Sequence, residues 1–370
     1  MRTVFKTNEC TACHACINIC TKNAIHIEDN IKACNAVIDN DLCINCQQCE
    51  KICPVNHPMK KVQPISWQQG WASDGVIRQE ASSGGLAAAL QRGFIENGGV
   101  VCSCVFQKGE FVFDFAYTIE EIKKFSGSKY VKSNPRHIYP EIKKLLNKGT
   151  KVLFLGLPCQ CAAVKKYTKN HELLFTVDLI CHGTPSPKTL KMFLTEKGYK
   201  IEEIKDIAFR KKTKYHLFVD NIGVEYPVVQ DRYIMAFLNA LCYTENCYAC
   251  NYATVERVSD ITLGDSWGST LEESEQRKGI SLILCQTEKG VSLLANSRVH
   301  VEAVDVEKAI NNNRQLRQPS VKPQEYDTFY AVLRKKGNFN KAVCKCYPKA
   351  CFRQNVKSAL IKLRFMRKEK

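Results

Sequence analysis

The sequence predicts a protein of the α+β or mixed α/β class, with a small cysteine-rich N-terminal module in front of a larger α/β core. Cysteines recur at one spacing in residues 10–20 and again in residues 43–53, which predicts the small module. Short apolar segments that lead into helical patterns predict the α/β core. The chain has 370 residues, 45% of them hydrophobic, which is enough for two or three packed domains.

The cysteine content and the N-terminal segment bear on the cellular compartment. The segment MRTVFKTNEC lacks the apolar stretch of a secretory signal, and no run reaches the ~18 apolar residues of a membrane span. We therefore expect a cytoplasmic protein, in which thiols stay reduced. The chain has 21 cysteines, an odd number, so a complete disulfide framework would leave one of them unpaired. Reduced thiols in tight clusters indicate a metal site instead.

The chain is strongly basic, with a formal net charge of +17 from 54 Lys and Arg against 37 Asp and Glu. Two iron–sulfur clusters of roughly −2 each would leave about +13. Such an excess favours acidic protein partners, anionic cofactors or a membrane surface. Because the lysines are spread along the whole chain, no nucleic-acid partner is predicted.

Both cysteine runs have the spacing C-x2-C-x2-C-x3-C; Thr21 follows the first and Pro54 the second. In two-cluster bacterial ferredoxins, three cysteines of such a run hold one [4Fe–4S] cluster and the fourth reaches the other. Zinc is the alternative, but its sites use two C-x-x-C pairs. The predicted ligands are therefore Cys10, Cys13, Cys16 and Cys53 for the first cluster, and Cys43, Cys46, Cys49 and Cys20 for the second.

The residues between the runs predict a β-hairpin with strands at Ala24–Ile27 and Ala36–Ile38, as expected of a dicluster ferredoxin fold in residues 1–62. We expect Cys34 to be a core thiol. Such clusters transfer single electrons, and residues 1–60 contain no pattern of a substrate pocket. The electrons must therefore leave the module for another part of the chain or for a partner.

A proline-rich linker in residues 55–66 separates the module from the core. A helix is predicted over residues 86–96, followed by a strand at Val100–Phe106. The turn Ser82–Gly85 before that helix has small residues whose N–H groups bind an anion or form an ordinary helix cap. The loop of residues 125–134, with Lys129 and Lys132, is interpreted as a phosphate-binding or a solvated loop.

Further cysteines stand at the ends of predicted strands or in loops. Cys159 follows a strand at Val152–Leu155, and Cys181 follows a strand at Val177–Ile180. Ligands in α/β folds bind at such strand ends. More cysteines lie at Cys242, Cys247 and Cys250, and two more strands are predicted in residues 260–265 and 280–287, with a helix over 289–296. The cysteines are either buried core thiols or ligands of a third metal cluster.

Taken together, the motifs SSGGL, GSKYVKS, FLGLPCQ, DLICHGTPSP, the C-x-x-C at 247–250 and SDITLGDSWG resemble the coenzyme F420 hydrogenase/dehydrogenase beta-subunit family. The resemblance covers about residues 67–300 and keeps the order of the family's motifs. It implies an N-terminal family domain in residues 67–145 and a C-terminal one in residues 150–320. Residues 1–60 resemble the two-cluster ferredoxin module that is often fused in front of this family.

The resemblance implies a mixed α/β flavoprotein core that carries FAD and a third [4Fe–4S] cluster. The implied ligands of that cluster are Cys159, Cys181, Cys247 and Cys250, with Cys161 and Cys242 as alternates. The residues implied near the flavin or its phosphates are Ser83, Gly84, Gly85, Ser128 and Lys129. His182 and Asp265 would lie close to the flavin ring and are the candidate catalytic residues.

Two functions are compatible with these features. The first is an iron–sulfur flavoprotein oxidoreductase that passes electrons between the clusters and a flavin, which exchanges hydride with a soluble substrate such as coenzyme F420. The second is a non-catalytic electron-transfer subunit that docks on a larger redox complex. A ferredoxin or another redox protein is the expected protein partner. No GxGxxG motif is present, which argues against direct use of NAD(P)H.

The segment 321–370 is predicted to be a basic helical tail that the resemblance does not explain. It holds Cys344, Cys346 and Cys351. We expect an amphipathic helix whose apolar face consists of Ala359, Leu360, Leu363 and Phe365, and whose basic face consists of Lys357, Lys362, Arg364 and Arg367. This helix docks on the protein's own core or contacts a membrane surface or a partner.

Overall fold

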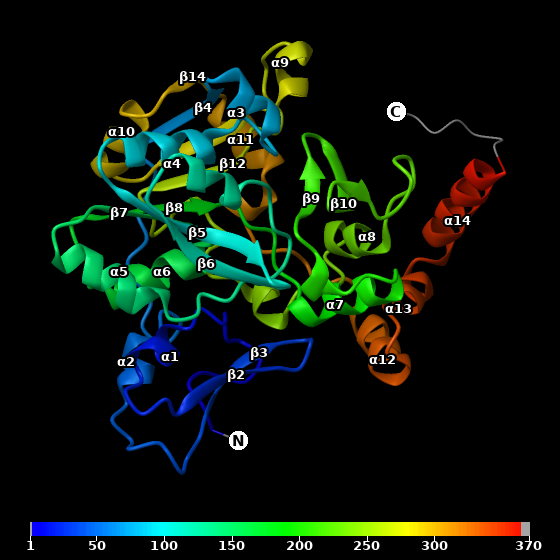
Figure 1. The fold of residues 1–370 in the computed structure, drawn as a ribbon, viewed down its shortest axis with the longest axis horizontal. Helices are drawn as coiled ribbons and strands as arrows, with labels where there is room; N and C mark the ends of the chain where they lie inside the picture. The colour runs from blue at the N-terminus through cyan, green and yellow to red at the C-terminus, as the bar shows by residue number, and fades with distance from the viewer. Residues whose placement is uncertain (1, 364–370) are drawn as a thin grey trace.

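A computed structural model describes residues 2–363, which form a mixed α/β protein around one large mixed sheet (Figure 1). The sheet has the strand order β14-β4-β13-β12-β8-β7-β5-β6. In chain order its strands are β4 (Ser66–Ala72), β5 (Val100–Gln107), β6 (Glu110–Ala116), β7 (Val152–Gly156), β8 (Leu174–Leu179), β12 (Ile261–Asp265), β13 (Ser281–Cys285) and β14 (Val299–Ala303). Strands β12, β8, β7 and β5 are parallel, and their neighbours on both sides are antiparallel.

Helices cover both faces of this sheet, because successive residues of a strand point to opposite faces. Val101 and Leu153 pack in the hydrophobic cluster of α4 and α10, whereas their neighbours Cys102 and Phe154 pack with α5 and α6. These helices are α4 (Leu86–Glu96), α5 (Ile138–Asn147), α6 (Pro158–Tyr167) and α10 (Glu288–Ala295). Burial on both faces explains why the central strands are continuous apolar runs.

A second, smaller unit is built on the antiparallel sheet β11-β10-β9. Its hydrophobic cluster includes Phe193, Phe209, Phe329 and Phe339, which come from segments far apart in the sequence. The elements are α7 (Pro187–Glu196), β9 (Ile207–Lys211), β10 (Lys214–Val219), β11 (Ile222–Gly223), α8 (Arg232–Leu238), α12 (Tyr326–Lys336) and α13 (Phe339–Cys346). Helices α12 and α13 therefore belong to a core of the protein, although the sequence predicted a tail from residue 321.

The N-terminal module lies against α5 and α6, on the side away from the large sheet (Figure 1). It consists of the antiparallel sheet β1-β3-β2 and two short helices. The bounds are β1 (Arg2–Thr3), α1 (Ala15–Ile19), β2 (Ile25–Asp29), β3 (Cys34–Ile38) and α2 (Gln48–Ile52). The predicted hairpin between the cysteine runs is confirmed, with both strands longer than expected.

Most elements that the sequence predicted in the core are present. The helix over residues 86–96 matches α4, and the predicted strands match β5, β7, β8, β12 and β13 within a few residues. One sheet combines strands of the segments 67–145 and 150–320, so these two predicted domains share a core. The remaining short elements are α3 (Gly75–Glu80), η1 (Glu120–Phe125), η2 (Ile201–Glu203), η3 (Glu245–Ala249), α9 (Glu273–Lys278), α11 (Val306–Asn312) and η4 (Arg314–Leu316).

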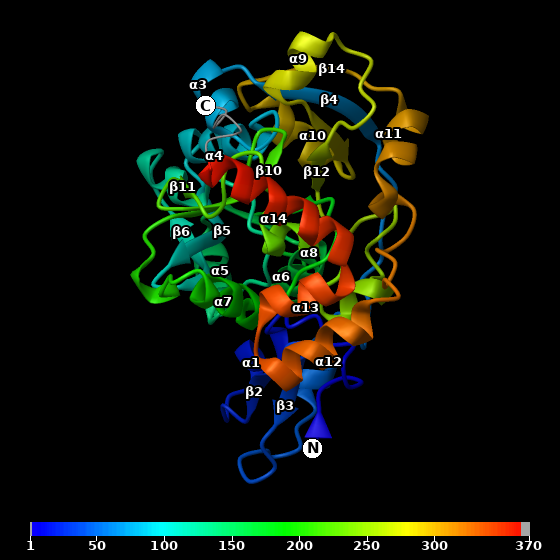
Figure 2. The ribbon, with the colours of Figure 1, turned by 90° about the vertical axis from the view of Figure 1, so that its right-hand side faces the viewer.

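The last helix, α14 (Pro348–Lys362), follows α13 and crosses the surface of the smaller unit (Figure 2). It buries Cys351 and Ile361, whereas Ala359 and Leu363 of the predicted apolar face stay exposed. The predicted face was therefore wrong in that part. The predicted positions Phe365, Arg364 and Arg367 lie outside the described residues. Within residues 2–363, no helix combines the length and the apolar character that a membrane crossing requires.

Candidate metal centres

The two cysteine runs follow the same backbone path. Ala12 and His14 in the first run have positive φ angles of 53° and 63°, and the matching Asn45 and Gln47 in the second have 55° and 58°. Residues other than glycine avoid this region at a cost of roughly 1–2 kcal/mol each. Alternating backbone of this kind turns N–H groups into a concave nest for an anion, a feature of many iron–sulfur sites. The Ala12 N–H donates to Cys10 Sγ at 3.4 Å.

The first site is the group of thiols that the sequence assigned to one cluster. Cys10, Cys13, Cys16 and Cys53 line one small cavity, so the fourth cysteine of the second run does meet the first run. Desolvation by burial raises the pKa of the Cys13 thiol to about 12, and burial also raises the pKa of Cys16. Bare thiolates are therefore unfavourable here, and a bound cation is needed to displace their protons.

The second site lies at the surface of the N-terminal module. Cys20, Cys43 and Cys49 pack against the same small hydrophobic cluster, whereas Cys46 is exposed. An Arg2 guanidinium nitrogen lies 4.0 Å from Cys43 Sγ and donates to the side chain of the neighbouring Asn45. A cluster held by these thiols would be reached by solvent and by a partner protein.

The third site gathers cysteines from three distant segments. Cys159 lies in the first turn of α6, Cys181 follows β8, and Cys247 and Cys250 come from η3 and its end. All four line a cavity of about 300 Å³. Cys247 Sγ accepts hydrogen bonds from the Thr184 N–H at 3.4 Å and from Asn246 Nδ2 at 3.7 Å. Hydrogen bonds to a sulfur ligand are typical of iron–sulfur sites, where they tune the potential.

The structure separates these four thiols from the two alternates. Cys161 and Cys242 are fully buried in hydrophobic clusters and do not line the cavity. The Cys161 thiol donates to the Val177 carbonyl at 3.6 Å. Cys161 is therefore a small buried residue of the core. The set that encloses the cavity is therefore the one that the resemblance implied.

The first and third sites are neighbours. Phe5, Thr11 and Val55 line both cavities, so a single layer of side chains separates them. The N-terminal module is held here by the Tyr139 hydroxyl, which donates to the Cys13 carbonyl at 2.7 Å inside the protein. The sequence contained no signal for the role of Tyr139, because its partner lies 126 residues away.

The chemistry of the donor sets fits iron–sulfur clusters. Within residues 2–363, no three Cys, His, Asp or Glu side chains lie close enough together to hold a single metal ion. A tetrahedral zinc ion draws its sulfur ligands to about 2.3 Å from one centre. The thiols of the third site instead line a cavity of about 300 Å³, as ligands at the corners of a larger inorganic body would.

The residues implied near a flavin are engaged in contacts within the protein. A Cβ at Gly84 would lie 2.6 Å from the Gly70 carbonyl oxygen, so close packing on β4 explains this glycine. The Ser83 hydroxyl donates to the Ile280 carbonyl at 3.1 Å, and Gly85 has a φ of 84° at the start of α4. The turn therefore has structural reasons for its composition.

The loop after η1 is closed by its own lysine. Lys129 Nζ donates to the carbonyl oxygens of Phe125, Ser126 and Gly127 at 2.7, 2.8 and 3.0 Å. The Ser128 N–H donates to the Ser82 hydroxyl at 3.2 Å, which joins this loop to the turn before α4. These donors are hydrogen-bonded within the protein in this structure, and their place near a flavin phosphate stays a prediction.

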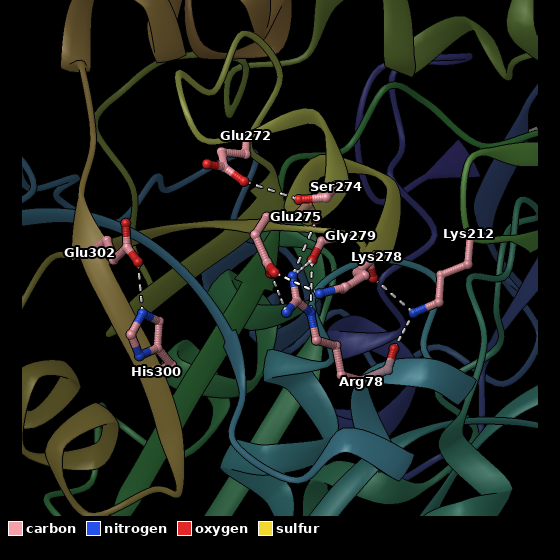
Figure 3. A network of polar contacts seen from close by, with 9 residues as sticks. All are labelled: Arg78, Lys212, Glu272, Ser274, Glu275, Lys278, Gly279, His300 and Glu302. Carbon is pink, nitrogen blue, oxygen red and sulfur yellow. Dashed lines mark hydrogen bonds and ion pairs between the residues drawn. The ribbon is translucent and has the colours of Figure 1, made fainter.

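A polar network around Arg78, on helix α3, lies next to the turn Ser82–Gly85 (Figure 3). Arg78 pairs with Glu275 at 2.7 Å and donates to the Gly279 carbonyl at 3.0 Å. The Lys212 ammonium donates to the carbonyl oxygens of Arg78 and Lys278. Figure 3 shows the Arg78 guanidinium pointing to Glu275 and Gly279, so this cation is also paired within the protein.

The two candidate catalytic residues lie in different surroundings. His182 lines the third-site cavity and is exposed. Asp265, at the end of β12, is held by both guanidinium nitrogens of Arg210 at 2.6 and 3.0 Å. Asp265 does not line that cavity, and sequence reasoning missed Arg210 because it stands on a distant strand, β9.

Comparison with known proteins gives three family matches. Two of them describe the beta subunit of coenzyme F420 hydrogenase/dehydrogenase: the model of its N-terminal part matches residues 68–136, and the model of its C-terminal part matches residues 149–309. A "4Fe-4S binding domain" model matches residues 36–56, which contain the second cysteine run.

Two individual proteins illustrate the similarity. One subunit of the F(420)H(2) dehydrogenase of Methanosarcina mazei is 20% identical over 293 residues, which cover 74% of this chain and 81% of that protein. A chain in a structure of the F420-reducing [NiFe] hydrogenase complex from Methanosarcina barkeri is 19% identical. The match covers 71% of this chain and 97% of that one, with a TM-score of 0.47.

Proposed function

Because the chain belongs to the coenzyme F420 hydrogenase/dehydrogenase beta-subunit family, we propose that it is the iron–sulfur electron-transfer subunit of a redox enzyme complex. The observation that carries the proposal is the placement of the thiols. The four cysteines of the first site and the four of the third line two cavities that share a wall. The cysteines of the second site lie at the surface of the N-terminal module. Residues 1–62 then act as a ferredoxin-type module on a cytoplasmic protein.

The residues have separate tasks in this proposal. Bound [4Fe–4S] clusters supply one-electron carriers. Cys13, Cys16 and Cys53 of the first site are buried and would hold a cluster away from solvent, which limits the loss of electrons to water and oxygen. The four thiols of the third site are half-buried. The second site is open, and Leu42 and Ile44 beside it are 51% and 60% exposed. Exposed apolar side chains are a feature of contact surfaces between proteins.

Support for a protein partner also comes from the relatives. One is named as a subunit, and the other similar chain belongs to a hydrogenase complex. We propose that a redox protein docks at the second site. Coenzyme F420 is a substrate class suggested by the family. It exchanges a hydride, whereas iron–sulfur clusters carry single electrons, so in this proposal its use belongs to the complex and not to this chain alone.

FAD stays a separate prediction. Ser83, Gly84, Ser128 and Lys129 are already hydrogen-bonded or closely packed within the protein, and no step of the proposed function depends on a flavin. Titration of the anaerobic protein with FAD tests this prediction. Stoichiometric binding with a shifted flavin spectrum would support the flavoprotein oxidoreductase as the function instead.

The test of the proposed function is anaerobic purification, followed by iron and sulfide analysis and reduction experiments. We expect about twelve iron atoms per chain for three clusters. Dithionite and a reduced ferredoxin should bleach the iron–sulfur absorption, whereas reduced F420, NADH and NADPH without a partner should not. A folded protein that stays free of iron after anaerobic reconstitution would overturn the proposal.

A further inference from the structure

Lys132 is a buried cation between two of the candidate centres. Its residue is only 7% exposed, and its backbone N–H donates to the Pro185 carbonyl at 2.9 Å. Its ammonium donates to the Thr11 carbonyl at 3.3 Å. Thr11 belongs to the first cysteine run and lines both cavities. Lys132 itself lines the cavity of the third site, so its side chain reaches from one centre to the other.

The surroundings of this ammonium are unusual for a buried lysine. Among the described residues, no carboxylate forms an ion pair with Lys132. The buried Lys165, in contrast, has the Asp260 carboxylate at 3.8 Å and donates to the Val258 carbonyl at 2.7 Å. An uncompensated buried ammonium is strongly unfavourable, so the negative charge near Lys132 must come from another source.

The cysteines of both sites are the groups that surround this ammonium. Lys132 lines the same cavity as Cys159, Cys181, Cys247 and Cys250 of the third site. The carbonyl that accepts from its ammonium belongs to Thr11, which stands next to Cys10 of the first site. A [4Fe–4S] cluster with its four thiolates carries a net charge of roughly −2, which provides the missing countercharge at each site.

We propose that Lys132 is the shared counter-cation of the first and third iron–sulfur centres and raises the midpoint potential of both. The inference rests on the proposed function, since it requires the clusters. A bound cluster that accepted one electron from dithionite would gain one negative charge, with no bond broken. A fixed positive charge stabilises the reduced form more than the oxidised form. Lys132 is thus a positioning residue that acts on the potential, and its hydrogen bond to Thr11 holds the two sites together.

The test compares full-length, anaerobically purified variants by potentiometric titration with electron paramagnetic resonance detection. In Lys132→Met we expect the electron affinity of the first and third centres to fall about tenfold, which corresponds to 59 mV for a one-electron couple. The second centre should be unchanged and serves as an internal control; a Cys46→Ser variant identifies its signal. Lys132→Arg keeps the charge and should keep the potentials of the wild type.

Lys188→Met is the matched control. Lys188 also joins the N-terminal module to the core, but it is exposed and donates to the Asp29 carbonyl rather than lying among cysteines. All three midpoint potentials should stay unchanged in this variant.

The outcomes separate this inference from the proposed function. Full iron content in Lys132→Met with three unchanged potentials would overturn the role of Lys132 and leave the proposed function intact. A wild-type protein without iron would instead remove the proposed function. Lys132→Gln is the second neutral variant. Lowered potentials of the first and third centres in either neutral variant that keeps its iron support the inference. Loss of a centre in both neutral variants shows a structural role and overturns it.

Discussion

The two cysteine runs are alike in sequence and in backbone but lie in different environments. Both have the same spacing, and both place a five-residue helix after residues with positive φ angles. In the first run, Cys13 and Cys16 are buried; in the second, the equivalent Cys46 is exposed and Cys49 is half-buried. The local sequence therefore specifies the backbone path of each run, while the burial of its thiols depends on what packs against it.

The packing that makes this difference comes from the core of the protein. Helix α1 contacts α5 and α6, and Cys13 and Ala15 belong to the hydrophobic cluster of those helices. The loop of the second run points away, with Leu42 and Ile44 exposed. A less solvated centre and a more solvated one differ in redox potential and in access for partners. The comparison therefore predicts one internal and one external centre.

The largest effect is expected from the crossed fourth ligands. Cys53→Ser should remove the first cluster and Cys20→Ser the second, although each residue stands in the other run. Each variant should lose about four iron atoms. Iron analysis and electron paramagnetic resonance spectra of the two variants should show different signals missing. Loss of the same signal in both variants would contradict the crossed arrangement.

The two centres should also differ in their resistance to chelators and oxygen. We expect the second cluster to be lost on the order of tenfold faster than the first, because a hydrophobic shell controls solvent access to a metal site. The measurement follows the two signals over time after addition of a chelator under anaerobic conditions, and again in air. Equal rates would show that the burial difference does not protect the first centre.

A third prediction concerns the attachment of the first run to the core. Tyr139→Phe removes the hydroxyl that donates to the buried Cys13 carbonyl. We expect a loss of about 1–3 kcal/mol in the free energy of unfolding, because a buried carbonyl loses its partner. Urea unfolding of the cluster-loaded protein measures it. Tyr117→Phe, at an exposed tyrosine, is the control, and an equally small change in both variants would argue against the role of Tyr139.

The smallest effect is expected at the open second site. A Leu42→Ser and Ile44→Ser double variant should slow electron exchange with a ferredoxin a few-fold, since it removes exposed apolar contact area. Stopped-flow absorption measures the rate. Reduction by dithionite and the iron content should stay unchanged. Ile222→Ser, at an exposed apolar residue of β11, is the control and should exchange electrons at the wild-type rate.

Local patterns in the sequence predicted much of the fold. The hairpin between the two cysteine runs and helix α4 were both predicted from residues that are neighbours in the chain. The α14 face was predicted only in part, because several sets of apolar residues fit a helical period, and contacts with the smaller unit select Cys351 and Ile361. The hydroxyl that accepts from the Gly84 N–H was not visible in the sequence either, since it belongs to Ser281 on β13.

The third site shows the same limit. Cys159 and Cys161 are two residues apart on α6, about 200° around the helix, so at most one of them faces the cavity. Only the packing of α6 on the sheet decides that Cys161 points into the core and Cys159 towards Cys181. The resemblance to a family supplied the set of four thiols; the residues alone left the question open.

The sequence by itself indicated iron–sulfur chemistry and predicted a crossed order of the ligands in the first 53 residues, because cluster geometry demands short, regular intervals between sulfur donors. The tertiary structure decided which centre is buried, which thiols enclose the third cavity, and that the single ammonium of Lys132 lies between two sites. These features depend on desolvation and charge, which are set by side chains that meet only after the chain has folded.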